Sequence, residues 1–565
     1  MAEYPWLHSY PAGIDWHKNY HAQSLPTMLE KAVARFHNRP CIDFFGFRMT
    51  YGALDHEVHK LAKGLQAIGV RKGVKVGLFL PNCPQFVVSY FAILKAGGTV
   101  VNYSPLYAEP ELLQQVEDSE TDIMVTLSLE ALFPTIHKVY QESRLKHLVV
   151  GRLDDALPFP KGLLYRIFKR RTMAVVDWKD AHIHDYRTLL KNDGVCRPVT
   201  INPEEDVAVL QYTGGTTGVP KGAMLTHANI YINTLQSRDW FPEMNDGQEV
   251  AAAFLPFFHV FAMTAIMTLS IVTGAEMAML PKFDIKEALK LIRRRRPTLM
   301  AGVPTMYTAL LGDARAKKAG LDRLKICLSG GAPLSQELKK KFEETFGGQL
   351  LEGYGLTEAS PVVSANPMGG AGRAGTIGLP LPATKILITN PDNPEQVLAQ
   401  GEKGEICVEG PQVMAGYWQR PEATEDVLQS GRLRTGDIGY MDEEGYTFII
   451  DRSKDLILVG GFNVFPRMIE EAIYQHPAVH EVTVIGIPDD YLGEVPKAFV
   501  SLKHPDENLT PEELQMFLKD KLGKHERPAQ IEFRDDLPKT MIGKLSKKEL
   551  VAEEKAKSTA QARSK

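Results

Sequence analysis

Short apolar runs alternate with amphipathic segments along the first part of the chain. The sequence predicts helices at 51–64 and 85–97 and strands at 75–80 and 99–102, with Gly, Pro and Asn between them. Apolar runs of this length indicate buried strands, and the periodic segments between them indicate helices that cover a sheet. The pattern therefore predicts a parallel sheet with helices on its faces.

The same alternation returns in the next part of the chain. Strands are predicted at 207–212 and 324–329, and helices at 228–236 and 336–346. The longest apolar stretch, 260–280, is interrupted by Thr, Ser, Gly and Glu, so it predicts a buried helix followed by a strand and no membrane span. The repetition predicts two similar α/β subdomains.

The pattern changes twice more before the chain ends. After about residue 380, short strands between Gly, Pro and Asp turns are typical of a small β-rich subdomain. A final α+β pattern then includes a helix that starts after Thr510, a plausible N-cap. Because 565 residues exceed one core, we predict an N-terminal domain over 1–452, a C-terminal domain over 453–552 and a charged, disordered tail over 553–565.

Composition excludes several classes of protein. The net charge of −4 gives no basic field for nucleic acid. The five cysteines lie far apart without zinc-ligand or redox spacing, which favours a reducing compartment. The first residues carry no basic segment followed by an apolar run, so we expect no secretory signal and a cytoplasmic protein.

The most informative segment is 212–222, which follows a predicted strand and precedes a helix predicted to begin near Thr226. Its glycines let the backbone turn and expose N–H groups, its threonines add hydroxyl donors, and a lysine supplies a cation. Pro220 before that lysine, and Gly222 after it, exclude a Walker A loop. The residues predicted to bind polyphosphate are Thr213, Gly214, Gly215, Thr216, Thr217, Gly218 and Lys221.

This segment resembles the signature loop of the acyl-adenylate-forming superfamily, which includes acyl-CoA synthetases, adenylation domains of nonribosomal peptide synthetases and beetle luciferases. Further family motifs follow in order, so the resemblance extends from about residue 25 to about 550. It implies that a carboxylate attacks the α-phosphorus of ATP to give an acyl-AMP, which a thiol then attacks. It also implies that the small C-terminal domain is mobile.

The resemblance implies a nucleotide site built from the segments 329–334 and 351–358. Tyr354 would stack on adenine, Thr357 would contact the α-phosphate, and Glu358 with Thr213 would bind Mg²⁺. The other implied contacts are Gly331, Ala332, Glu352, Gly353 and Gly355.

Later motifs supply the rest of the implied machinery. Asp437 would bind the ribose hydroxyls, which suits a carboxylate because it accepts two hydrogen bonds, and Arg452 would approach from the other side. Lys454 stands at the family's hinge, and Gly460 with Gly461 would line the pantetheine tunnel of CoA. Lys544, framed by Pro538 and Gly543, resembles the catalytic lysine.

The aromatic segment 255–263 stands where the family places the wall of its acid site. His259 is expected to lie near the carboxylate, to act as a lid or to be a core residue. Small side chains at Gly330 and Gly331, with Val303 as another wall residue, would let an acyl chain pass. Ordinary core packing remains the alternative at each of these positions.

The segment 430–452 resembles fatty acyl-CoA synthetases, with Arg432 and Arg434 where tryptophan and histidine are common. Overall the chain resembles the bacterial long-chain fatty acid–CoA ligases most. Medium-chain or aryl acid–CoA ligases stay open as alternatives. An inactive acyl- or nucleotide-binding protein would be expected to have lost Lys544, Glu358 or Asp437, and all three are present.

The segment 160–171 mixes apolar and basic residues at helical spacing. It predicts either docking on an anionic membrane, where fatty acid dissolves, or a helix that packs on the protein's own surface. The expected partners are therefore fatty acid, ATP, CoA and a membrane surface contacted peripherally on its inner face, with a homodimer left open.

Overall fold

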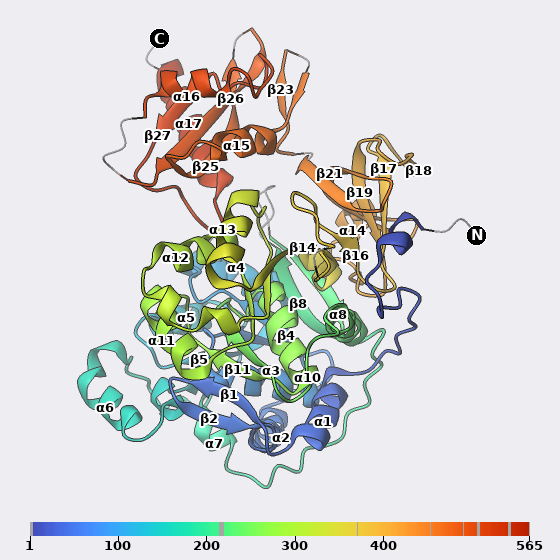
Figure 1. Cartoon of the computed structure of the whole chain (residues 1–565). Helices are drawn as coiled ribbons and strands as arrows, with labels where there is room; N and C mark the ends of the chain where they lie inside the picture. The colour runs from blue at the N-terminus through green and yellow to red at the C-terminus, as the bar shows by residue number, and fades with distance from the viewer. Residues whose placement is uncertain are drawn as a thin grey trace.

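The computed structural model has a large N-terminal body and a smaller C-terminal unit that lies above it in Figure 1. It describes residues 4–213, 220–369, 371–452, 454–460, 462–489, 491–504, 509–540 and 544–563. Some residues predicted to contact ligands lie outside these ranges, namely Gly214, Gly215, Thr216, Thr217, Gly218 and Gly461.

The first sheet of the body has the strand order β7-β6-β5-β3-β4-β8-β9. Its strands run parallel except at β9, which pairs antiparallel with β8. The strands are β3 (Lys75–Phe79), β4 (Thr99–Tyr103), β5 (Thr121–Leu127), β6 (His147–Gly151), β7 (Ile183–Asp185), β8 (Val207–Thr213) and β9 (Lys221–Thr226). The helices of this subdomain include α2 (Tyr51–Ala67), α3 (Pro84–Lys95), α4 (Glu109–Ser119) and α5 (Phe133–Glu142).

The second sheet has the order β16-β15-β14-β13-β12-β10-β11-β1-β2, with a parallel centre and antiparallel edges. Its strands are β1 (Pro40–Phe44), β2 (Phe47–Thr50), β10 (Val250–Ala253), β11 (Glu276–Met279), β12 (Leu299–Gly302), β13 (Ile326–Ser329), β14 (Gln349–Gly355), β15 (Val362–Ala365) and β16 (Leu379–Pro380). The predicted pair of α/β subdomains is confirmed.

The second subdomain also contains helices, and one helical region includes a π-helical turn. A π-helical turn, η4 (Met263–Thr268), separates the short helices α9 and α10 inside the apolar stretch, and such turns often mark functional sites. The helices are α1 (Leu25–Phe36), α8 (His227–Trp240), α9 (Val260–Ala262), α10 (Leu269–Thr273), α11 (Ile285–Arg295), α12 (Pro304–Gly312) and α13 (Gln336–Phe346).

The predicted β-rich subdomain is an antiparallel sheet in the order β18-β17-β19-β21-β20, with β22 on β21. Its last strand ends at Arg452, next to the C-terminal unit. The elements are β17 (Lys385–Asn390), β18 (Asn393–Val397), β19 (Gly404–Glu409), α14 (Pro421–Val427), β20 (Leu428–Gln429), β21 (Arg432–Met441) and β22 (Thr447–Arg452).

The C-terminal unit is α+β, with apolar clusters separate from that of the body. Its elements are β23 (Ile457–Val459), β24 (Phe462–Val464), α15 (Pro466–Tyr474), β25 (Val479–Asp489), β26 (Gly493–Leu502), α16 (Pro511–Leu518), β27 (Gln530–Phe533) and α17 (Lys547–Arg563). Thr510 is the N-cap of α16, where it forms a capping box with Glu513.

The end of the chain differs from its prediction. Residues 553–563, predicted to be disordered, belong to helix α17. The segment lacks large apolar residues, but it also lacks Gly and Pro. Its alanines, lysines and glutamates have high helix propensity. No helix within the described ranges combines the length and apolar character needed to cross a bilayer.

Candidate active site

The predicted phosphate-binding segment is enclosed by a β-hairpin. Thr213, at the end of β8, pairs with Lys221, at the start of β9, and the Thr213 hydroxyl lies 3.5 Å from the Lys221 carbonyl oxygen. Helix α8 begins at His227 with Thr226 as its N-cap, as the sequence predicted, but strand β9 was not predicted between the segment and this helix. Strand β9 therefore separates the predicted phosphate-binding segment from the N-terminus of α8.

Residues 414–418 form a wall beside the β8–β9 hairpin. The sequence did not predict a role for this segment. The N–H of Trp418 donates to the carbonyl of Gly222 (2.8 Å), and the N–H of Met414 donates to the carbonyl of Glu358 (2.8 Å). The Tyr417 hydroxyl donates to Glu358 Oε1 (2.6 Å). The Lys221 ammonium lies 5.2 Å from the centre of the Tyr417 ring, so these contacts gather a cation and a carboxylate around one aromatic residue.

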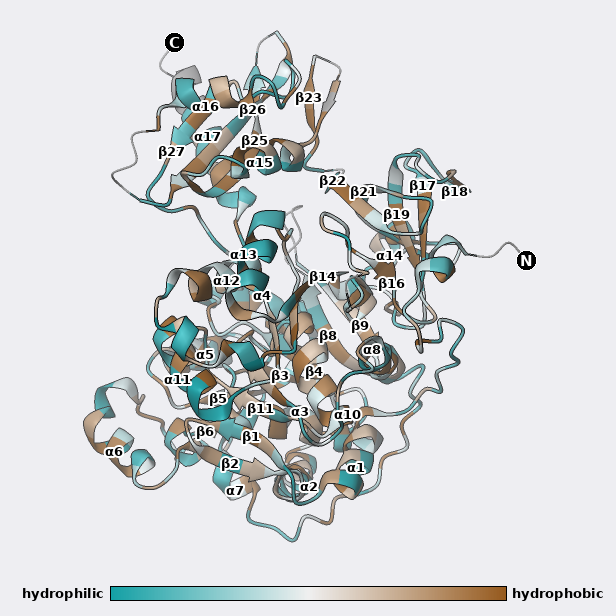
Figure 2. Ribbon diagram, viewed as in Figure 1, coloured by the Kyte–Doolittle hydropathy of each residue, from teal (hydrophilic) through white to brown (hydrophobic). Residues whose placement is uncertain are grey.

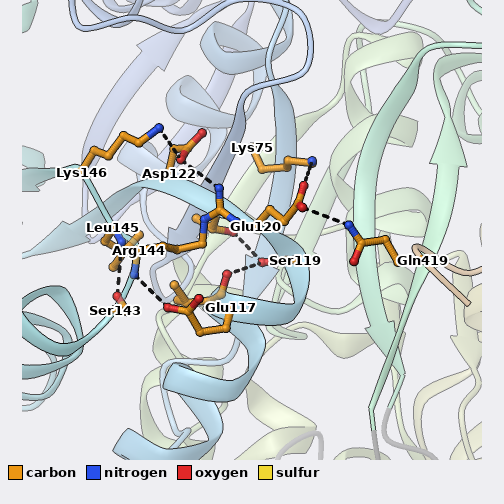
Figure 3. Close-up of polar contacts among 12 residues, drawn as sticks. Lys75, Glu117, Ser119, Glu120, Asp122, Ser143, Arg144, Leu145, Lys146 and Gln419 are labelled. Atoms are coloured by element: carbon orange, nitrogen blue, oxygen red, sulfur yellow. Dashed lines mark hydrogen bonds and ion pairs between the residues drawn. The ribbon is translucent and has the colours of Figure 1, made fainter.

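Polar contacts fix this wall to the first sheet. Lys75 Nζ donates to Glu120 Oε2 (2.8 Å), and Gln419 Nε2 donates to Glu120 Oε1 (3.0 Å), as Figure 3 shows. The Lys75 ammonium also lies 3.9 Å from the centre of the Trp418 ring. Next to these residues, Arg420 forms an ion pair with Asp118. These contacts hold the wall against the carboxyl end of α4 and the start of β3.

A second group of polar residues lies where β14, β21 and β22 meet. The Tyr354 hydroxyl donates to Asp437 Oδ2 (2.5 Å), and Arg452 Nε donates to Asp437 Oδ1 (3.1 Å). Asp437 and Arg452 are cross-strand partners, and Thr435 Oγ1 accepts from the Asp437 N–H (3.1 Å). Burial, together with the Asp437 charge, raises the pKa of Tyr354 well above its usual value. The buried carboxylate is thus held in place by donors on both oxygens.

Lys544 from the C-terminal unit reaches into this second group. A β-carbon on Gly331 would stand 3.2 Å from Lys544 Nζ and 3.7 Å from a methyl group of Val303. Burial, and then the charge of Arg452, lower the pKa of Lys544 to about 8, against the opposing effect of Asp437. The structure therefore brings the predicted catalytic lysine to the predicted nucleotide and acid sites.

Two of the residues predicted to form the acid site, Gly331 and His259, lie near the same lysine. Burial, and then the Lys544 charge, lower the pKa of His259 to about 3, so its ring is neutral at physiological pH. His259 Nδ1 accepts from the N–H of Phe261 (3.3 Å). A β-carbon on Gly330 would stand 3.0 Å from the Phe261 ring, which makes this phenylalanine part of the wall. A neutral histidine, a phenylalanine and two glycines thus line the position that faces the ammonium.

The other predicted residues fall into three places. Thr357 and Glu358 share the turn η7 (Thr357–Ala359), which joins the two groups above. Glu352 accepts from the Leu334 N–H (3.2 Å), and burial raises its pKa to about 7. Ala332, Gly353 and Gly355 lie on the β13–α13 connection and on β14.

Of the predicted hinge and thiol-channel residues, Lys454 and Gly460 lie within the described ranges, and neither contacts the groups above. Lys454 is exposed, just after the end of β22. The Gly460 N–H donates to the Leu492 carbonyl (2.8 Å), in the turn between β23 and β24. In Figure 1 strand β23 of this hairpin lies at the right-hand edge of the C-terminal unit.

Two family models match this chain. The model described as AMP-binding enzyme matches residues 29–418, and the model described as AMP-binding enzyme C-terminal domain matches residues 468–544. The chain belongs to the AMP-binding enzyme family. The second match ends at Lys544, the residue that lies against Gly331.

Relatives of this AMP-binding enzyme match it over nearly its whole length. A long-chain-fatty-acid–CoA ligase of Bacillus subtilis is 44% identical, covering 98% of this chain and 99% of its own. The structure of ATP-bound MatB from Rhodopseudomonas palustris has a TM-score of 0.82 and 28% identity, covering 94% and 98%. That of o-succinylbenzoate CoA synthetase (MenE) from Bacillus subtilis, with ATP and magnesium ion, has a TM-score of 0.75 and 28% identity, covering 93% and 98%.

Proposed function

We propose that this AMP-binding enzyme is a long-chain fatty acid–CoA ligase, which converts fatty acid, ATP and CoA into acyl-CoA, AMP and diphosphate through an acyl-adenylate. The observation that carries the proposal is the position of Lys544. Its ammonium lies beside Gly331, near Val303, and within electrostatic reach of Asp437 and Arg452. The long-chain assignment rests on the name of the Bacillus subtilis relative.

In the first step, a carboxylate oxygen attacks the α-phosphorus, an O–P bond forms, and the bond to diphosphate breaks. Two anions must approach, so cations at the developing charge lower the barrier. Lys544 would face the carboxylate and α-phosphate, while Lys221 and Thr213 would hold the outer phosphates. Asp437 would accept the ribose hydroxyls in place of the Tyr354 hydroxyl and the guanidinium that it now binds.

Magnesium fits this site through Glu358 and Thr213. Tyr417 donates to one Glu358 oxygen only, so the carboxylate is oriented and keeps lone pairs for a hard cation. The described ranges hold no cluster of three or more His, Cys, Asp or Glu side chains suited to a metal, which agrees with a cation held largely by phosphates. The bound ion would neutralise phosphate charge, and the structurally similar MenE was solved in complex with ATP and magnesium ion.

The chain of the fatty acid would lie beyond Phe261. Ala265 and Leu269, one and two helical turns after this residue, line an apolar cavity together with Leu328, two residues before Gly330. Trp240 and Met244 lie on the same cavity. An apolar space lined by residues that follow Phe261 and precede Gly330 in the sequence supports an acyl substrate.

In the second step, the thiol of CoA loses its proton, its sulfur attacks the acyl carbon, and AMP leaves. We propose that the C-terminal domain, 453–552, rotates about Lys454 against the N-terminal domain, 1–452. Rotation would withdraw Lys544 and bring in Gly460 and Gly461. In the arrangement observed, Leu458 and Phe462 of the β23–β24 hairpin are exposed, as expected for a surface that rotation covers.

We also propose that the enzyme is cytoplasmic, contacts the inner face of the membrane peripherally and forms homodimers. All five cysteines are free thiols, which fits a reducing compartment, and long-chain acids partition into bilayers. Light scattering in solution tests the homodimer.

Pyrophosphate exchange tests the central proposal. Palmitate, octanoate and benzoate are compared as acids, with wild-type enzyme and Lys544→Ala. We expect exchange fastest with palmitate, lost in Lys544→Ala, and CoA-dependent release of AMP by the wild type only. Absence of exchange with every acid would overturn the ligase proposal, and preference for benzoate would overturn its long-chain assignment.

A further inference from the structure

Helix α6 (Lys161–Phe168) projects from the body and lies in the chain between two strands of the first sheet. It belongs to an excursion that leaves β6 at Gly151 and returns to β7 at Ile183, and Figure 1 shows it at the lower left, away from the C-terminal unit. None of its own residues is buried. The sequence left open that this helix packs on the protein's own surface, and its exposure rules out such packing for its apolar face.

The helix is attached by its polar face. A β-carbon on Gly162 would stand 2.7 Å from the Asp154 carbonyl oxygen, so the helix closely approaches the backbone here. One turn later, Arg166 Nε donates to Asp154 Oδ2 (2.8 Å), and the Asp154 side chain is buried. At about 100° per residue, the side of the helix opposite these contacts carries the apolar side chains. They are Leu163, Leu164, Ile167 and Phe168.

These apolar side chains are unusually open to solvent. Ile167 is 58% and Phe168 is 78% exposed, and Phe159, just before the helix, is 88% exposed. Figure 2 shows hydrophobic residues on this projecting helix, beside hydrophilic ones. Monomeric proteins rarely present several large apolar side chains side by side unless a partner covers them.

Basic residues continue directly from this face. Lys169, Arg170 and Arg171 are exposed, and the last two belong to the turn η3 (Arg170–Thr172). Among the described residues no ion pair involves these three side chains, whereas Arg166 is neutralised by Asp154. Apolar side chains next to unpaired cations match the boundary between acyl chains and anionic headgroups, and they do not match a purely apolar protein partner.

We propose that the α6 surface, made of Phe159, Leu163, Leu164, Ile167, Phe168, Lys169, Arg170 and Arg171, docks on an anionic phospholipid bilayer. The proposal rests on the proposed function and deepens it, because a bilayer is where a long-chain acid is dissolved. The apolar side chains enter the acyl boundary, and the cations contact headgroup phosphates. The Arg166–Asp154 pair and Gly162 hold the helix so that its apolar face points outward.

Vesicle cosedimentation without any substrate tests this docking. The probes are vesicles of phosphatidylglycerol with phosphatidylcholine, and vesicles of phosphatidylcholine alone. Two variants change the α6 surface. The apolar variant combines Ile167→Glu with Phe168→Glu, and the basic variant combines Lys169→Glu, Arg170→Glu and Arg171→Glu. We expect each variant to lower the partition coefficient on anionic vesicles at least about tenfold. Matched controls change exposed residues elsewhere: Val195→Glu with Val397→Glu, and Lys317→Glu with Lys318→Glu and Lys340→Glu.

Activity on octanoate in lipid-free buffer separates this proposal from the proposed function. We expect both α6 variants to keep that activity, which also shows that they fold. Equal vesicle binding by wild type, controls and α6 variants would overturn the docking surface while leaving the ligase proposal standing. Loss of dimers in the α6 variants, with no wild-type binding to vesicles, would assign the surface to a second copy of the chain and overturn the membrane proposal.

Discussion

The side chain of Lys544 lies so close to Gly331 that a β-carbon on this glycine would stand 2.6 Å from the lysine Cε. Gly331 also has a φ of +80°, which an alanine adopts only with strain. We expect Gly331→Ala to displace the ammonium and to lower the rate of pyrophosphate exchange by about 100-fold.

Gly347→Ala is the matched control for this substitution. Gly347 has a φ of +78°, but a β-carbon there would meet nothing within 4 Å. It therefore introduces backbone strain without touching Lys544. Equal losses of exchange in the two variants would show that strain, and not the position of the ammonium, explains the Gly331 result.

The lowered pKa of Lys544 predicts how the first step depends on pH. Burial lowers this pKa to about 8, so the ammonium loses its proton as pH rises through about 8, and the cation required by the carboxylate and phosphate disappears. We expect kcat/KM for pyrophosphate exchange, which reports the free enzyme, to fall above about pH 8.

Lys544→Arg provides the control, because a guanidinium stays protonated across this range. The variant should be slower at pH 7 and should lack the alkaline decrease. Persistence of that decrease in Lys544→Arg would assign it to another group.

The Tyr417 hydroxyl predicts an effect on magnesium use. It donates a hydrogen bond to Glu358 Oε1. Tyr417→Phe keeps the aromatic ring beside Lys221 but removes this hydrogen bond, so the Glu358 carboxylate is no longer held in one orientation. We expect a higher magnesium concentration for half-maximal exchange, with a loss of about tenfold at limiting magnesium. Tyr446→Phe, which removes a hydroxyl bound to the Ala371 carbonyl, serves as control and should match wild type. An unchanged magnesium dependence in Tyr417→Phe would contradict the role of Tyr417 in positioning Glu358.

The apolar cavity predicts a determinant of chain length. Ala265 is buried on its wall, so Ala265→Phe should fill space that a long acyl chain needs. We expect kcat/KM for palmitate to fall at least about tenfold relative to hexanoate. Ala288→Phe in helix α11 overpacks the core elsewhere and should lower stability without altering this ratio. Parallel losses for both acids in Ala265→Phe would place the acyl chain outside this cavity.

Local patterns predicted much of the fold because most central strands and helices carry their own signal. Strand β3 follows from a short apolar run, and helix α3 follows from a longer apolar segment that begins with Pro84. The pairing of β1 with β11 connects residues more than 200 positions apart, and no local pattern specifies such a partner. Strand β9 was missed because Lys221 and Gly222 resemble the end of a turn, while its pairing with β8 makes it a strand.

The resemblance to family motifs led to Asp437 and Lys544, and the structure brings these two residues near each other, while their roles stay predictions. Tyr417 was missed because its role depends on contact with Glu358, which lies 59 positions away. The only available signal was an aromatic pair with Trp418 in a Gly-rich stretch, and such pairs usually belong to cores.

The excursion that carries α6 leaves and rejoins the first sheet at neighbouring strands, where Leu148 pairs with Ile183 and Val150 with Asp185. Its two ends are thereby fixed by main-chain pairing, independently of what lies between them. Because the entropy of closing a loop rises slowly with its length, the excursion can lengthen, shorten or change its sequence at little cost to folding. Evolution, or a designer, can thus change the proposed docking surface without altering the residues of the candidate active site.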